Sequence, residues 1–138
     1  MKYDLIIEGL FQSTNTYDPF KICESLDVLL EYVDIENPLG DTIYLHNKPI
    51  IMLANKLKHS PQSYFVCAHE LGHIINHQGV QGYYTLNKTT HNQMEVEASK
   101  FALILCSRLY TENNGFKAKN IYELKHEFGV DEDLADYF

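Results

Sequence analysis

The segment HELGH at residues 69–73 is the feature that most restricts what this chain can fold into. His69 and His73 are four residues apart, so on an α-helix both imidazoles project from one face and can reach a single metal ion. Glu70 lies about 100° around such a helix from His69, where its carboxylate can take a proton from a water molecule activated by zinc. A zinc site of this kind needs a third protein ligand, and therefore a second element packed against the helix.

The helical segment from Asn92 offers two carboxylates as the third ligand, Glu95 and Glu97. An apolar stripe runs along this segment and is formed by Ala98, Phe101, Ala102, Leu105 and Leu109. Extending the stripe toward the N-terminus meets Glu95, which is therefore expected on the buried face. Glu97 shares its face with Lys100 and Arg108, a spacing typical of a solvated, ion-pairing surface. We therefore predict that Glu95 is the third zinc ligand.

Small residues on the same side of this second helix favour a close approach to the HELGH helix. Ala98, Ser99 and Ala102 would allow the two helix axes to lie near each other, as a site shared between them requires. Ser99 follows Glu95 by four residues, so its hydroxyl could hydrogen-bond one of the metal ligands.

A metal-free interpretation uses the same residues, with two ordinary histidines on a helix face and Glu95 only ion-paired. A carboxylate on an apolar stripe needs a partner, however, and zinc supplies one.

His77 extends the row of histidines on the HELGH helix by one turn. Three successive turns of a straight helix cannot converge on one ion, so we expect His77 to act at the C-terminus of the helix. Candidates for an oxyanion donor are Tyr83, Tyr84 and His91, each with a structural role as the alternative.

Composition excludes several classes of protein. The chain has 138 residues, of which 45% are hydrophobic, enough for one domain with a core that needs no disulfides. The short apolar run at the N-terminus is neither a secretory signal nor long enough to span a bilayer, and the three widely spaced cysteines are expected to be reduced and buried, as in a cytoplasmic protein. The net charge of -8 argues against direct contact with nucleic acid.

Turn and cap signals predict the order of the elements. Apolar runs bounded by turn residues predict strands at residues 27–35, 42–46 and 50–54, and the spacing of the last two suits a hairpin or a tight connection. Asp18-Pro19 and Ser60-Pro61 each place a capping side chain before a proline at the start of a helix. The segment from Gln78 to Thr90 has the composition of a loop. Helices are expected at residues 19–26, 62–79, 92–114 and 119–128, with a break at Gly129 before a final short helix.

These elements predict an α+β fold. A small three-stranded sheet is expected to pack on the HELGH helix, and the second ligand-bearing helix is expected to lie behind it.

The two halves of the metal motif resemble the ImmA/IrrE family of metallopeptidases. The family pattern is HExxH, a variable loop and then E-x-x-A-(N/D)-x-F-A, which here correspond to HELGH and to EVEASKFA at residues 95–102. The segment DPFKICESL is similar to the initial helix of the family, and IYELKHEFGVDEDL resembles its closing segment. Ser99 stands where the family usually has Asn or Asp, and Arg108 where it usually has Pro. The resemblance covers the chain from about Asp18 almost to the C-terminus.

The resemblance implies a zincin-like fold, similar to a minimal gluzincin, with His69, His73 and Glu95 as zinc ligands and Glu70 as general base. It further implies that residues 1–138 are a single metallopeptidase domain, a zinc endopeptidase that cleaves a helix-turn-helix repressor to induce a phage or mobile element. One alternative is a zinc-stabilised antirepressor that binds the repressor without cleaving it. Another is a zinc-dependent hydrolase with a non-protein substrate. The presence of Glu70 favours catalysis, because a purely structural zinc site needs no general base.

Overall fold

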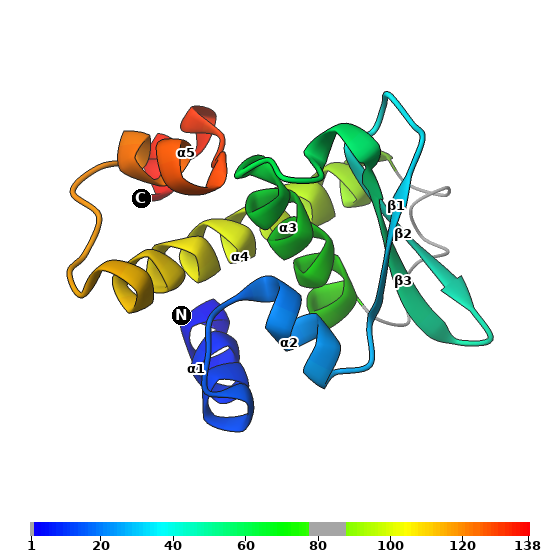
Figure 1. The fold of residues 1–138 in the computed structure, drawn as a ribbon, viewed down its shortest axis with the longest axis horizontal. Helices are drawn as coiled ribbons and strands as arrows, with labels where there is room; N and C mark the ends of the chain where they lie inside the picture. The colour runs from blue at the N-terminus through cyan, green and yellow to red at the C-terminus, as the bar shows by residue number, and fades with distance from the viewer. Residues whose placement is uncertain (1, 78–87) are drawn as a thin grey trace.

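The computed structural model describes the backbone of residues 2–77 and 88–138 and the side chains of residues 3–76 and 92–138. The elements follow one another as α1 (Lys2–Thr14), α2 (Pro19–Ser25), β1 (Leu29–Val33), β2 (Gly40–Leu45), β3 (Lys48–Ala54), the 3-10 helix η1 (Asn55–Leu57), α3 (Gln62–His77), α4 (Lys88–Asn114), α5 (Ile121–Phe128) and the 3-10 helix η3 (Glu132–Tyr137). Figure 1 shows the sheet at one side of the molecule, with α3 beside it. Within the described residues, no helix combines the length and the apolar character needed to cross a membrane.

The three strands form one sheet in the order β1-β3-β2. β2 and β3 are an antiparallel hairpin, as predicted, whereas β1 runs parallel to β3. Ile51 and Leu53 of β3 are fully buried, while Leu29 and Ile43 of the neighbouring strands are exposed. Alternating burial of this kind is expected for a sheet with one covered face, and α3 lies on that face. The predicted α+β fold, a three-stranded sheet on the HELGH helix, is confirmed.

α3 contacts β2 and β3 and packs along α4. The Ser60 Oγ accepts a hydrogen bond from the Gln62 N–H at 3.2 Å, and α3 begins at Gln62 as predicted. On α4, Ala98 and Ala102 are fully buried, so small side chains line the predicted seam between the helices. α4 begins at Lys88, earlier than the loop composition up to Thr90 predicted, because helix propensity at a helix end is a weak signal.

α1 is an element that the sequence pattern did not predict, and it packs against α4. Arg108 of α4 donates a hydrogen bond to Asp4 Oδ1 at 2.9 Å and another to Glu8, and the Tyr3 hydroxyl donates to Glu97 Oε1 at 2.9 Å. The face that carries Glu97 and Arg108 forms ion pairs, as predicted, and it is half-buried rather than fully solvated because α1 partly covers it. Helical periodicity identifies a charged face and does not reveal which distant charged segment docks on it.

The three cysteines are free and fully buried, as predicted. The Sγ atoms of Cys23 and Cys67 are 3.9 Å apart, in contact without a covalent bond. The contact with Cys23, together with burial, raises the pKa of the Cys67 thiol, and burial raises the pKa of the Cys106 thiol. All three therefore behave as parts of the core.

The C-terminal elements follow the predicted order. The Asn120 side chain caps α5 by accepting hydrogen bonds from the backbone N–H groups of Tyr122 and Glu123. Gly129 ends α5 with a left-handed φ of 69°, which confirms the predicted break, and the final short helix is the 3-10 helix η3.

Candidate metal and catalytic site

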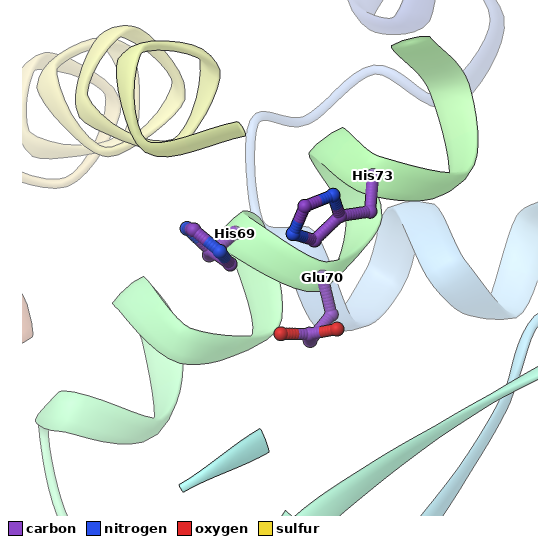
Figure 2. Close-up of side chains that lie close together, drawn as sticks. All are labelled: His69, Glu70 and His73. Carbon is purple, nitrogen blue, oxygen red and sulfur yellow. The ribbon is translucent and has the colours of Figure 1, made fainter. Parts of the chain in front are cut away.

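His69, Glu70 and His73 occupy neighbouring positions on α3, and their side chains lie close together (Figure 2). One potential ligand atom from each lies within 4.8 Å of those of the other two. Glu70 and His73 are buried, with 7% and 8% of their surface exposed, and the side chain of His69 is 16% exposed. The helical geometry predicted for HELGH is thus present, in a partly desolvated position.

Glu95 reaches the two histidines from α4. Its Oε1 lies 3.2 Å from His69 Nε2, and its Oε2 lies 2.7 Å from His73 Nε2. The carboxylate therefore contacts both imidazoles at once, with one oxygen for each. The side chain of Glu95 is 44% exposed, so the expectation of a buried position was wrong in depth. Its direction toward α3 was predicted correctly, because the apolar stripe shows which side of α4 faces α3. The stripe does not show where the contact between the two helices opens to solvent.

Glu97 points to a different neighbour, although it is only two residues away. It accepts the hydrogen bond from Tyr3 of α1 described above. The choice of Glu95 over Glu97 as the residue that faces the histidines therefore agrees with the structure.

Ser99 makes the contact with a histidine that its spacing predicted. Its Oγ lies 3.1 Å from His69 Nδ1. If Nδ1 carries the proton and donates it to Ser99, His69 Nε2 keeps its lone pair, which is the state in which an imidazole binds a metal. Nε2 is the nitrogen that faces Glu95.

The ionisation of Glu95 is coupled to the two histidines that it contacts. Burial acts against ionisation of Glu95, but the hydrogen bonds with His69 and His73 outweigh it and hold the pKa of the carboxyl well below its usual range. Burial also acts to lower the pKa of His73, but the hydrogen bond and charge of Glu95 outweigh that and raise it. Two imidazole nitrogens and one carboxylate thus converge in a small volume, and this donor set fits a divalent metal ion.

Glu70 has surroundings that differ from those of Glu95. Its Oε1 accepts a hydrogen bond of 2.8 Å from the Thr42 hydroxyl on β2. Burial raises the pKa of Glu70, against the opposing effects of His69, Thr42 and His73. A carboxylate with a raised pKa next to potential metal ligands is suited to general base catalysis.

The remaining predicted residues lie at the limit of what the structure describes. His77 is the last residue of α3, and His91 lies in the first turns of α4, but their side chains are outside the described residues. Tyr83 and Tyr84 are also outside them. Roles for these four side chains stay predictions.

The family model described as the IrrE N-terminal-like domain, a peptidase family, matches residues 23–138. The chain belongs to the ImmA/IrrE family. The matched region of this ImmA/IrrE protein includes α3 and α4 complete, and thus every residue of the candidate site, whereas α1 precedes it. Comparisons with curated proteins and with solved structures find no match.

Thr42 of this ImmA/IrrE protein is a site residue that the sequence did not reveal. A threonine at an inward-facing position of a short strand carries no local signal of a functional role. The sequence predicted a sheet on α3, but the contact with Glu70 depends on which residue of β2 faces this carboxylate, and local pattern does not give that.

Proposed function

We propose that this chain is a zinc-dependent endopeptidase in which His69, His73 and Glu95 hold the metal and Glu70 is the general base. The observation that carries the proposal is that the two oxygens of the Glu95 carboxylate contact Nε2 of both histidines. Membership of a metallopeptidase family supports it independently. Two histidines and one glutamate are a ligand set of catalytic zinc sites, which leave room for water and substrate.

The residues of the chain then divide the chemistry between them. A bound zinc ion supplies a Lewis acid for the scissile carbonyl and makes water more acidic. Glu70 accepts the proton of the attacking water and delivers it to the leaving amine. Burial raises the pKa of Glu70, the direction that suits a group that must both accept and release this proton.

The position of β2 suggests how a protein substrate binds. β2 is an edge strand of the sheet, and Thr42 on this strand contacts Glu70. An extended segment that pairs with the β2 edge would therefore pass next to the general base. A flexible linker can adopt this extended form, and the substrate we propose is a helix-turn-helix repressor whose cleavage induces a phage or mobile element. The peptidase family supports a protein substrate, and we expect no direct contact of the chain with nucleic acid.

We also propose that residues 1–138 act as one metallopeptidase domain in the cytoplasm. One cluster of buried side chains includes residues from α1 to α5, in support of a single unit. Free, buried cysteines suit a reducing compartment.

The alternative is a zinc-stabilised antirepressor that docks on the repressor without cutting it. The net charge of -8 favours this candidate, because an acidic surface attracts a basic DNA-binding domain. Against it stands Glu70, which lies beside the candidate ligands and is held by Thr42, an arrangement that docking does not require.

Substitution of Glu70 by Gln separates the two functions. Gln keeps the size of the side chain and one hydrogen-bonding oxygen but cannot take up the proton, so cleavage should fall by orders of magnitude while folding and zinc content survive. The assay is induction of a repressor-controlled reporter in cells, with immunoblotting of the repressor. Glu97→Gln, on the opposite side of α4, is the matched control.

Repressor fragments with the wild type and Glu97→Gln, but none with Glu70→Gln, would support the endopeptidase. Induction by Glu70→Gln with the repressor intact would reject it in favour of the antirepressor, since one neutral substitution changes little of a protein-sized interface.

A further inference from the structure

The Glu70 carboxylate is held by a hydrogen bond from a different element of the fold. The Thr42 hydroxyl of β2 donates to Glu70 Oε1 at 2.8 Å, across 28 residues of sequence. Among the described residues, Thr42 is the only group that donates a hydrogen bond to this carboxylate. One oxygen of Glu70 is therefore fixed, and the other is left for a proton.

The close packing of β2 on α3 makes this contact possible. At Gly40, two residues before Thr42, an added Cβ would lie 2.5 Å from Val66 Cγ1 and 3.4 Å from Glu70 Cγ. A side chain at this position would push the strand away from α3, so the absence of one lets β2 approach Glu70. Thr42, on the same side of β2 as Gly40, then comes within hydrogen-bonding reach.

The backbone of Thr42 faces the free edge of the sheet. The Ala54 N–H donates to the Leu39 carbonyl oxygen at 2.8 Å, so the backbone of Leu39 points toward β3. In an antiparallel pair, every second residue bonds to the neighbouring strand and the residues between them point away from it. The N–H and C=O groups of Thr42, three residues after Leu39, therefore point away from β3. The Thr42 N–H is accordingly occupied by the side chain of Asp41, at 2.9 Å. Thr42 thus faces Glu70 with its side chain and the open edge with its backbone.

We propose that Thr42 is a positioning residue that orients the Glu70 carboxylate for proton transfer and links this orientation to substrate pairing at the β2 edge. The inference rests on the proposed peptidase function. A peptide paired with the edge would hold the Thr42 backbone and, through the hydroxyl, Glu70. Loss of the hydroxyl leaves the base in place but free to rotate, which lowers turnover more than it weakens substrate binding.

The first test compares two substitutions of Thr42. Thr42→Val keeps the shape and removes the hydroxyl, whereas Thr42→Ser keeps the hydroxyl. The substrate is the fluorogenic decapeptide, from a random library, that the zinc-loaded wild type cleaves fastest. We expect kcat of Thr42→Val to fall about tenfold to a hundredfold, with KM changed less than about threefold, and Thr42→Ser to retain most of the activity. Zinc affinity, measured by calorimetry, should be unchanged in both.

Thr16→Val is the matched control, because Thr16 donates a comparable hydrogen bond, of 2.9 Å, to Glu112 away from the site. It should lower the melting temperature without changing kcat. Unchanged kcat in Thr42→Val, or a loss in Thr42→Ser equal to that in Thr42→Val, would overturn the inference.

The second test needs neither metal nor substrate. Melting temperatures of the metal-free Thr42→Val, Glu70→Ala and double variants form a double-mutant cycle. If Thr42 holds Glu70, the shift of the double variant differs from the sum of the single shifts, and additive shifts overturn the inference. A wild type that cleaves neither these peptides nor the repressor would instead reject the proposed function, while the cycle still decides whether Thr42 holds Glu70.

Discussion

Single residues in this molecule take their roles from the helix face that they occupy. Glu95 and Glu97 have the same side chain and lie on the same helix, yet one contacts His69 and His73 and the other contacts Tyr3. Two residues along a helix correspond to a rotation of about 200°, so the two carboxylates face opposite neighbours. Substitution of Glu97 can therefore serve as the control for substitution of Glu95, within one turn of α4.

We expect Glu95→Ala to lose far more zinc affinity than Glu97→Ala, as measured by calorimetric titration of both variants. Loss of a residue that only supports a ligand typically costs about tenfold to a hundredfold in affinity, so loss of a ligand should cost more than about a hundredfold. Glu97→Ala removes the acceptor of the Tyr3 hydrogen bond, on the side of α4 that faces away from the histidines, and should bind zinc like the wild type. Equal losses would contradict the assignment of Glu95.

At the scale of elements, close backbone contacts fix where the smaller helices sit. Gly129 ends α5 with a left-handed φ of 69°, and a Cβ added there would lie 2.5 Å from Gln62 Cα, at the first residue of α3. Gly115, just after α4, is also left-handed, with a φ of 82°, but a Cβ there would meet nothing within 4 Å. Both glycines have the left-handed backbone conformation, but only Gly129 packs closely against another element.

Gly129→Ala should therefore destabilise the protein more than Gly115→Ala. The left-handed conformation costs a non-glycine residue about 1–2 kcal/mol in either case, and the contact with α3 adds about 1–3 kcal/mol for Gly129 alone. Chemical denaturation of the two variants gives the difference in the free energy of unfolding. If both variants lose the same amount, α5 does not pack on the start of α3 as the structure shows.

At the scale of the whole molecule, the candidate site joins two long helices. The histidines come from α3 and Glu95 from α4, which are separated in the sequence by the segment 78–87. A metal held by all three side chains would tie these helices together in the folded state only. Its binding free energy would then add to the stability of the fold.

We expect elemental analysis to find about one zinc per chain, and added zinc to raise the melting temperature of the metal-free protein. At a free zinc concentration of 100 times Kd, binding stabilises the folded state by about 2.7 kcal/mol. His73→Ala should abolish this shift, and substitution of the exposed His126 on α5 should preserve it. A shift that survives in His73→Ala would place the metal elsewhere.

Local signals in the sequence predicted most of the secondary structure and identified the side chains of the candidate site. Period and cap signals located α3, α5 and the β2–β3 hairpin, because these depend on residues close together in the chain. The spacing within HELGH and the stripe on α4 also indicated which side chains face one another, since a helix converts spacing into direction.

The tertiary structure alone decided the contacts between distant segments. The docking of α1 on Arg108, the parallel pairing of β1 with β3, and the hydrogen bond from Thr42 to Glu70 each join residues far apart in the sequence. No local pattern encodes such contacts, because they depend on the shape and charge of two surfaces that meet only when the whole chain is folded. The exposure of Glu95 has the same origin: periodicity gave its direction, and only the packing of α3 and α4 set its depth.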